Sequence, residues 1–123
     1  MVYRVVFTPE AERQLEELFL HVAMASSAGT AQRFTSAVIG TCERLALFPH
    51  RGTPREDIRP GLRVSHHRGR TVIAYAVEET PPQVAILGVF YGGQDYASAL
   101  NDELGKGQDT ESDLDRPDRS EPT

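Results

Sequence analysis

The hydrophobic pattern changes its period near residue 50, and this change limits the chain to folds that combine helices with a sheet. Before that point, apolar side chains recur at the spacing of one helix face. Between residues 62 and 91 they alternate or run continuously, as they do in strands. Because the chain has 123 residues, we expect one domain with one modest core.

The first strand and the first helix are predicted to meet at a sharp boundary. Residues 2–7 alternate between two faces, which indicates a strand. Thr8 is the expected N-cap of the helix that follows, with Pro9 at its first position and acidic side chains near its positive end. The apolar face of this helix comprises Ala11, Leu15, Leu18, Phe19 and Val22.

A second amphipathic helix is predicted after a four-residue joint at residues 26–29. Thr30 is its expected N-cap, and Pro49 is expected to stop it. Two such helices with a short joint form an antiparallel hairpin. The apolar face of the second helix comprises Ala31, Phe34, Val38, Cys42, Leu45 and Phe48.

The second half of the chain predicts three strands and a short helix. The strands are expected at residues 62–67, 71–77 and 84–91, with a tight turn in which Gly69 has a positive φ. The last strand is apolar on both faces, which is typical of a central strand, and residues 94–100 form the final helix. The predicted fold is α+β, in the order β-α-α-β-β-β-α, with the helix hairpin packed on a small, mostly antiparallel sheet.

Charge divides the chain into a body, residues 1–102, and an acidic tail, residues 103–123. Residues 101–123 hold eight acidic and three basic side chains, whereas residues 1–100 hold ten of each, so the whole net charge of −5 lies in the last 23 residues. The tail has few large apolar residues and cannot bury enough surface to offset its ordering entropy. We expect it to be disordered.

Arginines concentrate between residues 51 and 70, where six stand against two acidic residues. Four of them are candidate contacts for an acidic segment or a phosphate backbone: Arg59, Arg63, Arg68 and Arg70. In a strand over 62–67, Arg63 shares a face with Ser65 and His67, and Arg70 begins the next strand. The alternative is a solvated face on which Arg63 pairs with an acidic side chain at position 56 or 57.

Histidine and cysteine give weak evidence for chemistry. His66 and His67 are expected on opposite faces of a strand, and no other ligand is suitably spaced, so we expect no metal site. His67 is either a general acid–base group near Arg63 or an exposed turn residue. Cys42 lies on the apolar face of the second helix and is expected to be an inert packing residue.

Two tyrosines flank a glycine pair at the end of the last strand. Tyr91 and Tyr96 either offer contact area to a partner, which the glycines allow to approach, or pack within the domain. In the second case Tyr91 packs against the core, and Tyr96 attaches the last helix to the sheet.

Several classes of protein are not expected. The longest apolar run has eight residues, too few to cross a membrane, and the first ten residues hold no apolar stretch typical of a secretory signal. A single cysteine permits no disulfide within the chain, which fits the cytoplasm.

The ordered set of motifs resembles the ParE branch of the RelE/ParE toxin superfamily, once called plasmid stabilisation proteins. The resemblance covers roughly residues 2–100 and rests on the set as a whole. Its motifs are Tyr3-Arg4-Val5-Val6-Phe7-Thr8-Pro9-Glu10-Ala11, Ala31-x-x-Phe34, Leu45-x-x-Phe48-Pro49-x-x-Gly52, Gly61-Leu62-Arg63, Ile73-x-Tyr75 and Val84-x-Ile86-x-x-Val89-Phe90-Tyr91-Gly92-Gly93-Gln94-Asp95.

The resemblance implies one small domain without cofactor or metal, held inactive by a cognate antitoxin whose C-terminal segment wraps over its helices and sheet. It implies a hetero-oligomer with that antitoxin, no membrane association and no sequence-specific DNA binding by this chain. ParE relatives poison DNA gyrase, whereas RelE relatives cleave messenger RNA in the ribosome with basic residues and an acid–base group on the sheet face.

The chain departs from the family pattern at the end of the last strand. Tyr91 and Gln94 stand where many relatives have histidine and arginine, and Ala76 stands where a basic residue is common. These losses favour gyrase binding over RNA cleavage. The expected partner-binding residues are Arg59, Arg63, Arg70, Tyr91 and Tyr96.

Two alternatives remain open. One is a metal-independent ribonuclease that acts through Arg63, Arg70, His67 and Tyr91, since such a reaction needs an acid, a base and cations at the phosphate. The other is an interaction module without toxicity.

Overall fold

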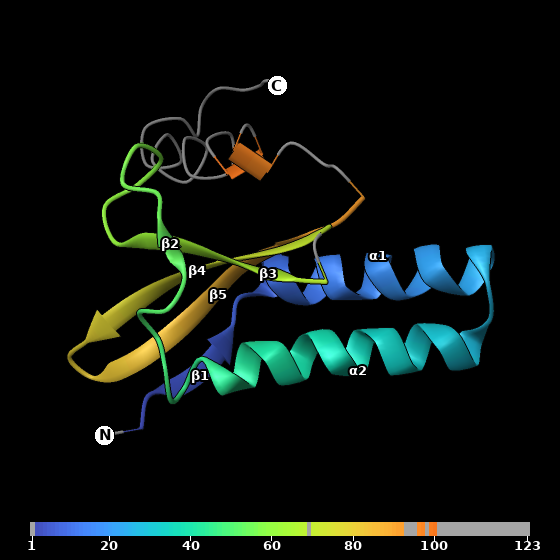
Figure 1. Cartoon of the computed structure of the whole chain (residues 1–123), viewed down its shortest axis with the longest axis horizontal. Coiled ribbons are helices and arrows are strands. Elements are labelled where there is room, and N and C mark those ends of the chain that lie inside the picture. Colours follow the sequence, from blue (N-terminus) through green and yellow to red (C-terminus); the bar gives the residue numbers. More distant parts are fainter. Residues whose placement is uncertain (1, 69, 93–95, 98, 101–123) are drawn as a thin grey trace, which may run out of the picture.

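One strand, two long helices and then four strands follow one another in the computed structural model, which describes residues 2–68, 70–92, 96–97 and 99–100. The helix hairpin packs on the sheet, which confirms the predicted α+β fold (Figure 1). A two-residue strand, β2, was not predicted. The elements are β1 (Arg4–Phe7), α1 (Pro9–Ala25), α2 (Ala28–Arg44), β2 (Thr53–Pro54), β3 (Leu62–His67), β4 (Thr71–Glu79) and β5 (Pro82–Phe90).

The sheet has the strand order β1-β5-β4-β3-β2. Among the strand pairs of the described residues, only β1–β5 is parallel, so the predicted mostly antiparallel sheet is confirmed. The apolar segment at residues 84–91 falls mainly in β5, which lies between β1 and β4. Its two-sided burial explains why apolar residues occupy consecutive positions there.

The start of α1 follows the sequence prediction. The side chain of Thr8 accepts a hydrogen bond from the backbone N–H of Ala11 at 3.2 Å, and Pro9 is the first helical residue. The same hydroxyl donates to the carbonyl of Ile86 on β5 at 2.9 Å. One side chain therefore both caps the helix and attaches it to the sheet.

Thr8→Ala is expected to lower the free energy of unfolding by about 1–2 kcal/mol, because the cap and the bond to Ile86 are lost together. Chemical denaturation measures this loss. Thr8→Ser keeps the hydroxyl and should recover most of the stability. Equal losses in the two variants would contradict the role assigned to the hydroxyl.

The start and the end of α2 differ from the prediction. Ser27, not Thr30, is the N-cap, because its hydroxyl accepts the backbone N–H of Thr30 at 3.1 Å and the helix begins at Ala28. The joint between the helices is therefore residues 26 and 27. The helix ends at Arg44, and Phe48 is 61% exposed rather than part of the apolar face. The backbone N–H of Tyr3 bonds to the Ala46 carbonyl at 3.0 Å, so the segment after α2 turns toward β1.

The two faces of the sheet carry separate apolar cores. The helix side buries the larger one, and the other side is covered by residues near 58 and by helical residues 96, 97, 99 and 100, drawn in orange above the sheet in Figure 1. The helix-side core comprises Ala11, Leu15, Leu18, Val38, Cys42, Leu45, Ile73, Tyr75, Val84, Ile86 and Val89. The second comprises Leu62, Val64, Ala74, Phe90 and Leu100.

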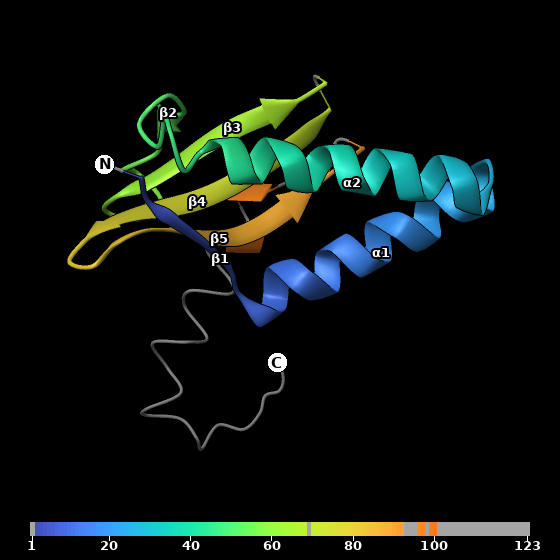
Figure 2. The same cartoon turned by 90° about the horizontal axis from the view of Figure 1, so that it is seen from below.

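The far end of the helix hairpin projects beyond the sheet (Figure 2). There α1 exposes Leu20 and Met24, which are one helical turn apart; Met24 is 88% exposed. No helix in the described ranges is long and apolar enough to span a membrane.

Several sequence predictions concern residues outside the described ranges. These are the positive φ of Gly69, the glycine at position 93, the residues at positions 94 and 95, and the disordered tail at 103–123. In the neighbouring turn, Arg68 has a φ of 54°, a conformation that is uncommon for a residue with a side chain. The four described helical residues between 96 and 100 agree with the predicted final helix.

Candidate functional site

The segment from Pro49 to Gly52 is held against the sheet by two side chains. The buried Tyr75 hydroxyl on β4 donates to the Pro49 carbonyl at 2.9 Å and accepts the Gly52 N–H at 3.0 Å. Arg63 on β3 donates to the carbonyls of His50 at 2.9 Å and Gly52 at 2.6 Å. Arg63 and Tyr75 are directly opposite each other in the β3–β4 register, so together they fix this loop.

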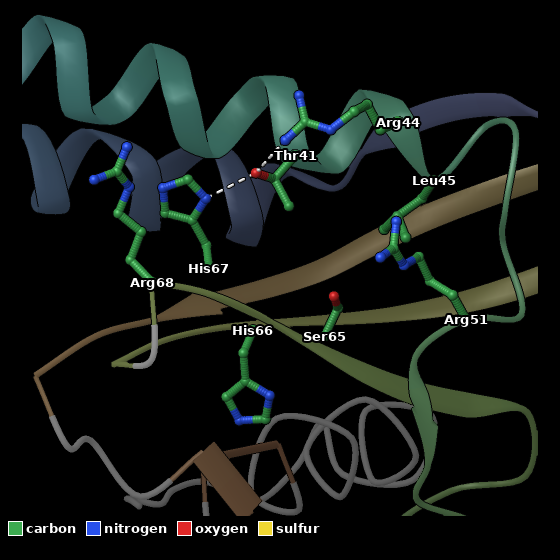
Figure 3. A pocket seen from close by; sticks show the side chains of 8 residues that line it. All are labelled: Thr41, Arg44, Leu45, Arg51, Ser65, His66, His67 and Arg68. Atoms are coloured by element: carbon green, nitrogen blue, oxygen red, sulfur yellow. Dashed lines mark hydrogen bonds between the residues drawn. The ribbon is translucent and has the colours of Figure 1, made fainter.

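Beside this loop lies a pocket of about 320 Å³, which we call the arginine pocket. Three guanidinium groups reach it from separate segments: Arg44 from the end of α2, Arg51 from the anchored loop, and Arg68 from the turn after β3. Figure 3 shows Arg51 and Arg68 at opposite ends of the pocket. Its lining residues, none of them acidic, are Thr41, Arg44, Leu45, Arg51, Ser65, His66, His67 and Arg68.

None of these three arginines forms an ion pair within the described part of the chain. Arg44 donates instead to the neutral Thr41 hydroxyl at 3.0 Å. The pocket therefore has a local positive charge without a balancing carboxylate among its lining residues. Clustered guanidinium groups favour oxyanions, which they bind through paired hydrogen bonds.

His67 joins the sheet to α2 at the floor of the arginine pocket. Its Nδ1 lies 2.7 Å from the Thr41 hydroxyl, and its ring meets that of Phe34 edge-on. Since Thr41 donates its one hydroxyl proton to the Ala37 carbonyl, the Nδ1 atom of His67 is assigned as the donor. The Nε2 atom is then a buried acceptor without a partner in the described residues. Burial, followed by the nearby charges of Arg68 and Arg44, lowers the pKa of His67.

This environment predicts a pH dependence of stability. Because the folded pKa of His67 lies below its ordinary value of 6.5, the unfolded chain takes up a proton first as the pH falls. The contribution of neutral His67 is complete above that value and is lost progressively below it. Wild-type protein should lose unfolding free energy between pH 7.5 and 5.5 more steeply than His67→Gln, as measured by urea denaturation. His66→Gln, at an exposed site, should keep the wild-type slope; parallel slopes in all three proteins would contradict the assignment.

The structure separates the predicted arginines. Arg63 is occupied by two loop carbonyls and does not pair with either of the acidic residues at positions 56 and 57, so that alternative is wrong. Arg70 is exposed in the turn before β4, at the far end of β3 from Arg63, so the two do not form one patch. Arg59 is half-buried in the turn that leads into β3.

The two tyrosines both have contacts within the domain. Tyr91 packs against the helix-side core, with its ring 5.0 Å from that of His21 on α1. Tyr96 packs in the opposite core, and its hydroxyl accepts a hydrogen bond from Arg55 at 2.6 Å. These contacts confirm the packing interpretation of both residues; their predicted role in partner binding remains a prediction.

The two adjacent histidines of β3 lie in different surroundings. His66 points away from α2 and is exposed, which confirms that it and His67 lie on opposite faces (Figure 3). His67 is buried, so the expectation of an exposed turn histidine is wrong; its strand places it under α2.

Burial raises the pKa of the Cys42 thiol to about 12, which supports an inert role. No group of three potential metal ligands occurs among the described residues.

Sequence reasoning missed four residues of the site: Thr41, Arg44, Arg51 and Tyr75. Arg51 was counted in the arginine-rich stretch, but no local pattern indicated that the loop would bring it beside the turn after β3. Tyr75 was only a motif position, and its hydroxyl contacts depend on a loop 23 residues earlier in the chain. A buried tyrosine in a central strand was the one available signal, because such a hydroxyl needs a partner.

A second, shallower depression of about 580 Å³ lies between the two helices. It is lined by Leu15 and Phe19 of α1 together with polar residues of both helices. Its charged members include Glu12, Arg13 and Glu16.

Comparison with known proteins places these features in a family context. Residues 5–96 match the family described as "ParE toxin of type II toxin-antitoxin system, parDE". No curated protein gives a significant match in sequence.

Two solved structures resemble this fold. The RelBE2 toxin–antitoxin complex of Mycobacterium tuberculosis contains a chain with 26% sequence identity and a TM-score of 0.59; the match covers 75% of this chain and all of that one (100%). The chromosomal ParDE toxin–antitoxin system of P. aeruginosa contains a chain with 16% identity and a TM-score of 0.63, covering 73% and 96% respectively. At 16% identity the likeness shows the fold alone.

Proposed function

The chain belongs to the ParE toxin family of type II toxin–antitoxin systems, and we propose that it acts by binding and poisoning DNA gyrase while a cognate antitoxin neutralises it. We place this action in the cytoplasm, where gyrase and the antitoxin are found together. The toxin itself performs no chemical step in this proposal; it arrests growth by occupying a site on a large target.

The proposal rests on one observation: Arg63, His67 and Tyr91, which the sequence offered for RNA cleavage, are all engaged in contacts within the domain. Arg63 holds loop carbonyls, and His67 is buried under α2 with its Nδ1 bonded to Thr41. Tyr91 packs against the helix-side core, with its ring beside that of His21 on α1. A general acid–base pair must reach the substrate within hydrogen-bond distance, and these side chains do not converge on one point.

Supercoiling by purified gyrase tests the proposal. Full-length chain in micromolar excess should inhibit supercoiling of relaxed plasmid, and prior mixing with the antitoxin should restore it. A matched control is the same titration with a topoisomerase of another class, which should be unaffected. Normal supercoiling at every toxin concentration would overturn the choice of target.

The projecting helix hairpin is the surface proposed to bind the antitoxin. Leu20 and Met24 form an apolar strip there that no described residue covers, and exposed apolar surface of this kind marks protein contacts. Arg70, exposed at the opposite end of the sheet layer from the anchored loop, is a proposed additional contact. The other predicted residues, Arg59, Arg63, Tyr91 and Tyr96, remain proposed partner contacts, and the last three also have the contacts within the domain described above.

Copurification tests the antitoxin surface. Leu20→Lys combined with Met24→Lys should reduce recovery of the tagged cognate antitoxin, because apolar contact is replaced by charge. Thr53→Lys, also exposed but on β2, should leave recovery unchanged. Equal recovery of all three toxins would exclude the hairpin strip as a contact.

RNA cleavage of the RelE type is the second candidate, and the arginine pocket favours it. Its lining combines three guanidinium groups with the hydroxyls of Thr41 and Ser65, a setting suited to a phosphate. In a purified translation system, this candidate predicts cleavage of translated messages that is lost in Arg51→Ala. Intact messages under translation would remove it.

A further inference from the structure

We propose that the arginine pocket binds carboxylates of this chain's own acidic segment, residues 109–115, so that the chain shields this cationic site. The proposal concerns the chain by itself and does not depend on the identity of the cellular target. Failure of the gyrase assay would therefore leave it untouched.

The pocket supplies the cationic half of the pairing. Arg44, Arg51 and Arg68 line the pocket from three segments of the chain, and none forms an ion pair with a described residue. All eight lining side chains are neutral or basic. Guanidinium groups left without counter-charges bind carboxylates readily, and a segment of the same chain needs no second molecule to supply them.

The acidic segment supplies the other half. It holds Asp109, Glu111, Asp113 and Asp115, and its remaining residues carry no charge. These carboxylates occupy alternate positions, and in an extended chain alternate side chains point to the same side. Such a segment can therefore present a row of negative charge to one surface.

The outer edge of β3 gives this row a place to lie. β2 pairs with β3 only at Arg63 and Val64, so no described strand pairs with the outer edge from Ser65 to His67. That free edge borders the arginine pocket, which Ser65, His66 and His67 help to line. An extended segment can hydrogen-bond along such an edge while its side chains meet the neighbouring cations.

The last described residue lies close enough for the segment to reach the pocket. Leu100 packs in the same cluster as Leu62 and Val64, on the face of β3 that is turned away from α2 and that also carries His66, so the segment would reach the pocket around the outer edge of β3. Eight residues separate Leu100 from Asp109 and can span up to about 30 Å. A tether of this length gives the segment an effective concentration of roughly millimolar at the pocket.

A spin label on the full-length chain tests the contact by NMR. The nitroxide is attached through Ser112→Cys, in the middle of the acidic segment; Cys42 is fully buried and is not expected to react. We expect loss of amide signal intensity at residues 65–68 and at Arg51 and Arg44. The loss should disappear at about 1 M salt, where the Debye length is roughly 3 Å.

Two matched variants separate charge pairing from other causes. The first neutralises the segment by D109N, E111Q, D113N and D115N with the label in place, and the second is Arg51→Gln with Arg68→Gln, both exposed positions. Both should abolish the loss of intensity while leaving the remaining spectrum unchanged. Signal loss elsewhere on the surface, or loss that persists in either variant, would overturn the proposal.

A phosphate titration tests whether the arginine pocket binds the phosphate groups of nucleic acid instead of the carboxylates of the acidic segment. If inorganic phosphate or a short RNA shifts the guanidinium signals equally in the wild-type and the neutralised chain, the pocket serves nucleic acid and the proposal fails. If the neutralised chain binds either probe more tightly, the acidic segment competes for the pocket, as we propose.

Discussion

Tyr75→Phe is expected to lower the free energy of unfolding by about 2–4 kcal/mol although it removes a single oxygen atom. That oxygen bonds to the Pro49 carbonyl and to the Gly52 N–H, and its loss leaves two backbone groups without partners at a buried point. Each unsatisfied group costs roughly 1–3 kcal/mol. Thermal denaturation should show a large fall in Tm, since about 1 kcal/mol corresponds to roughly 4–8 °C in a domain of this size.

Tyr3→Phe is the matched control for this measurement. The Tyr3 hydroxyl donates to Glu79 at 2.7 Å, but at an exposed site where water replaces the bond. We expect a change within about 0.5 kcal/mol. If Tyr75→Phe is as mild as Tyr3→Phe, the loop is held by something other than the tyrosine.

Gly52→Ala is the second substitution with a large expected effect, again about 2–4 kcal/mol. A Cβ atom at this position would lie 2.5 Å from the Tyr75 hydroxyl and 2.7 Å from the Val64 carbonyl. The carbonyl belongs to a paired strand and cannot move aside without weakening β3, so the loop must shift and its bond to Tyr75 is lost. Overpacking and the lost hydrogen bond therefore add.

Gly40→Ala provides the control for a glycine that is not confined. Its new methyl group would meet only the flexible end of Arg44, at 3.7 Å, within a helix. Alanine is the better helix former, so we expect a gain of up to about 1 kcal/mol. A loss at Gly40 comparable with that at Gly52 would show that the close approach to Tyr75 is not the cause.

These two substitutions also concern function, because the anchored loop carries Arg51 into the arginine pocket. Tyr75 and Arg63 act on the loop's backbone and leave the Arg51 side chain free to face the pocket. The anchored loop therefore determines where Arg51 lies in the arginine pocket. Any activity that uses Arg51 should decline with loop stability as well as with the charge itself.

The elements that local chemistry determines were predictable from the sequence. The cap at Thr8, the proline after it and the change of hydrophobic period all act over a few residues, and the structure confirms each. The sequence offered both Ser27 and Thr30, two residue types favoured as N-caps, and the prediction chose the wrong one. β2 was missed because two residues, Thr53 and Pro54, are too short to show any period.

The candidate site was less predictable because its contacts join distant parts of the chain. Strand alternation placed Arg63 and His67 on one face correctly, but it could not reveal that α2 and the loop at Pro49 cover that face. Because α2 and the loop cover this face, Arg63 and His67 form internal contacts and not an exposed cationic surface. Arg44 and Arg51 became site residues only through this arrangement.

Mapping of 5′ ends on a translated message, during growth arrest by this chain, tests most directly whether it acts by binding rather than by RNA chemistry. We predict that primer extension shows no new ends when the toxin is induced without its antitoxin, while plasmid DNA isolated from the same cells is relaxed or cleaved. Cuts at defined positions in the message, lost in Arg51→Ala and accompanied by normal plasmid supercoiling, would contradict the account.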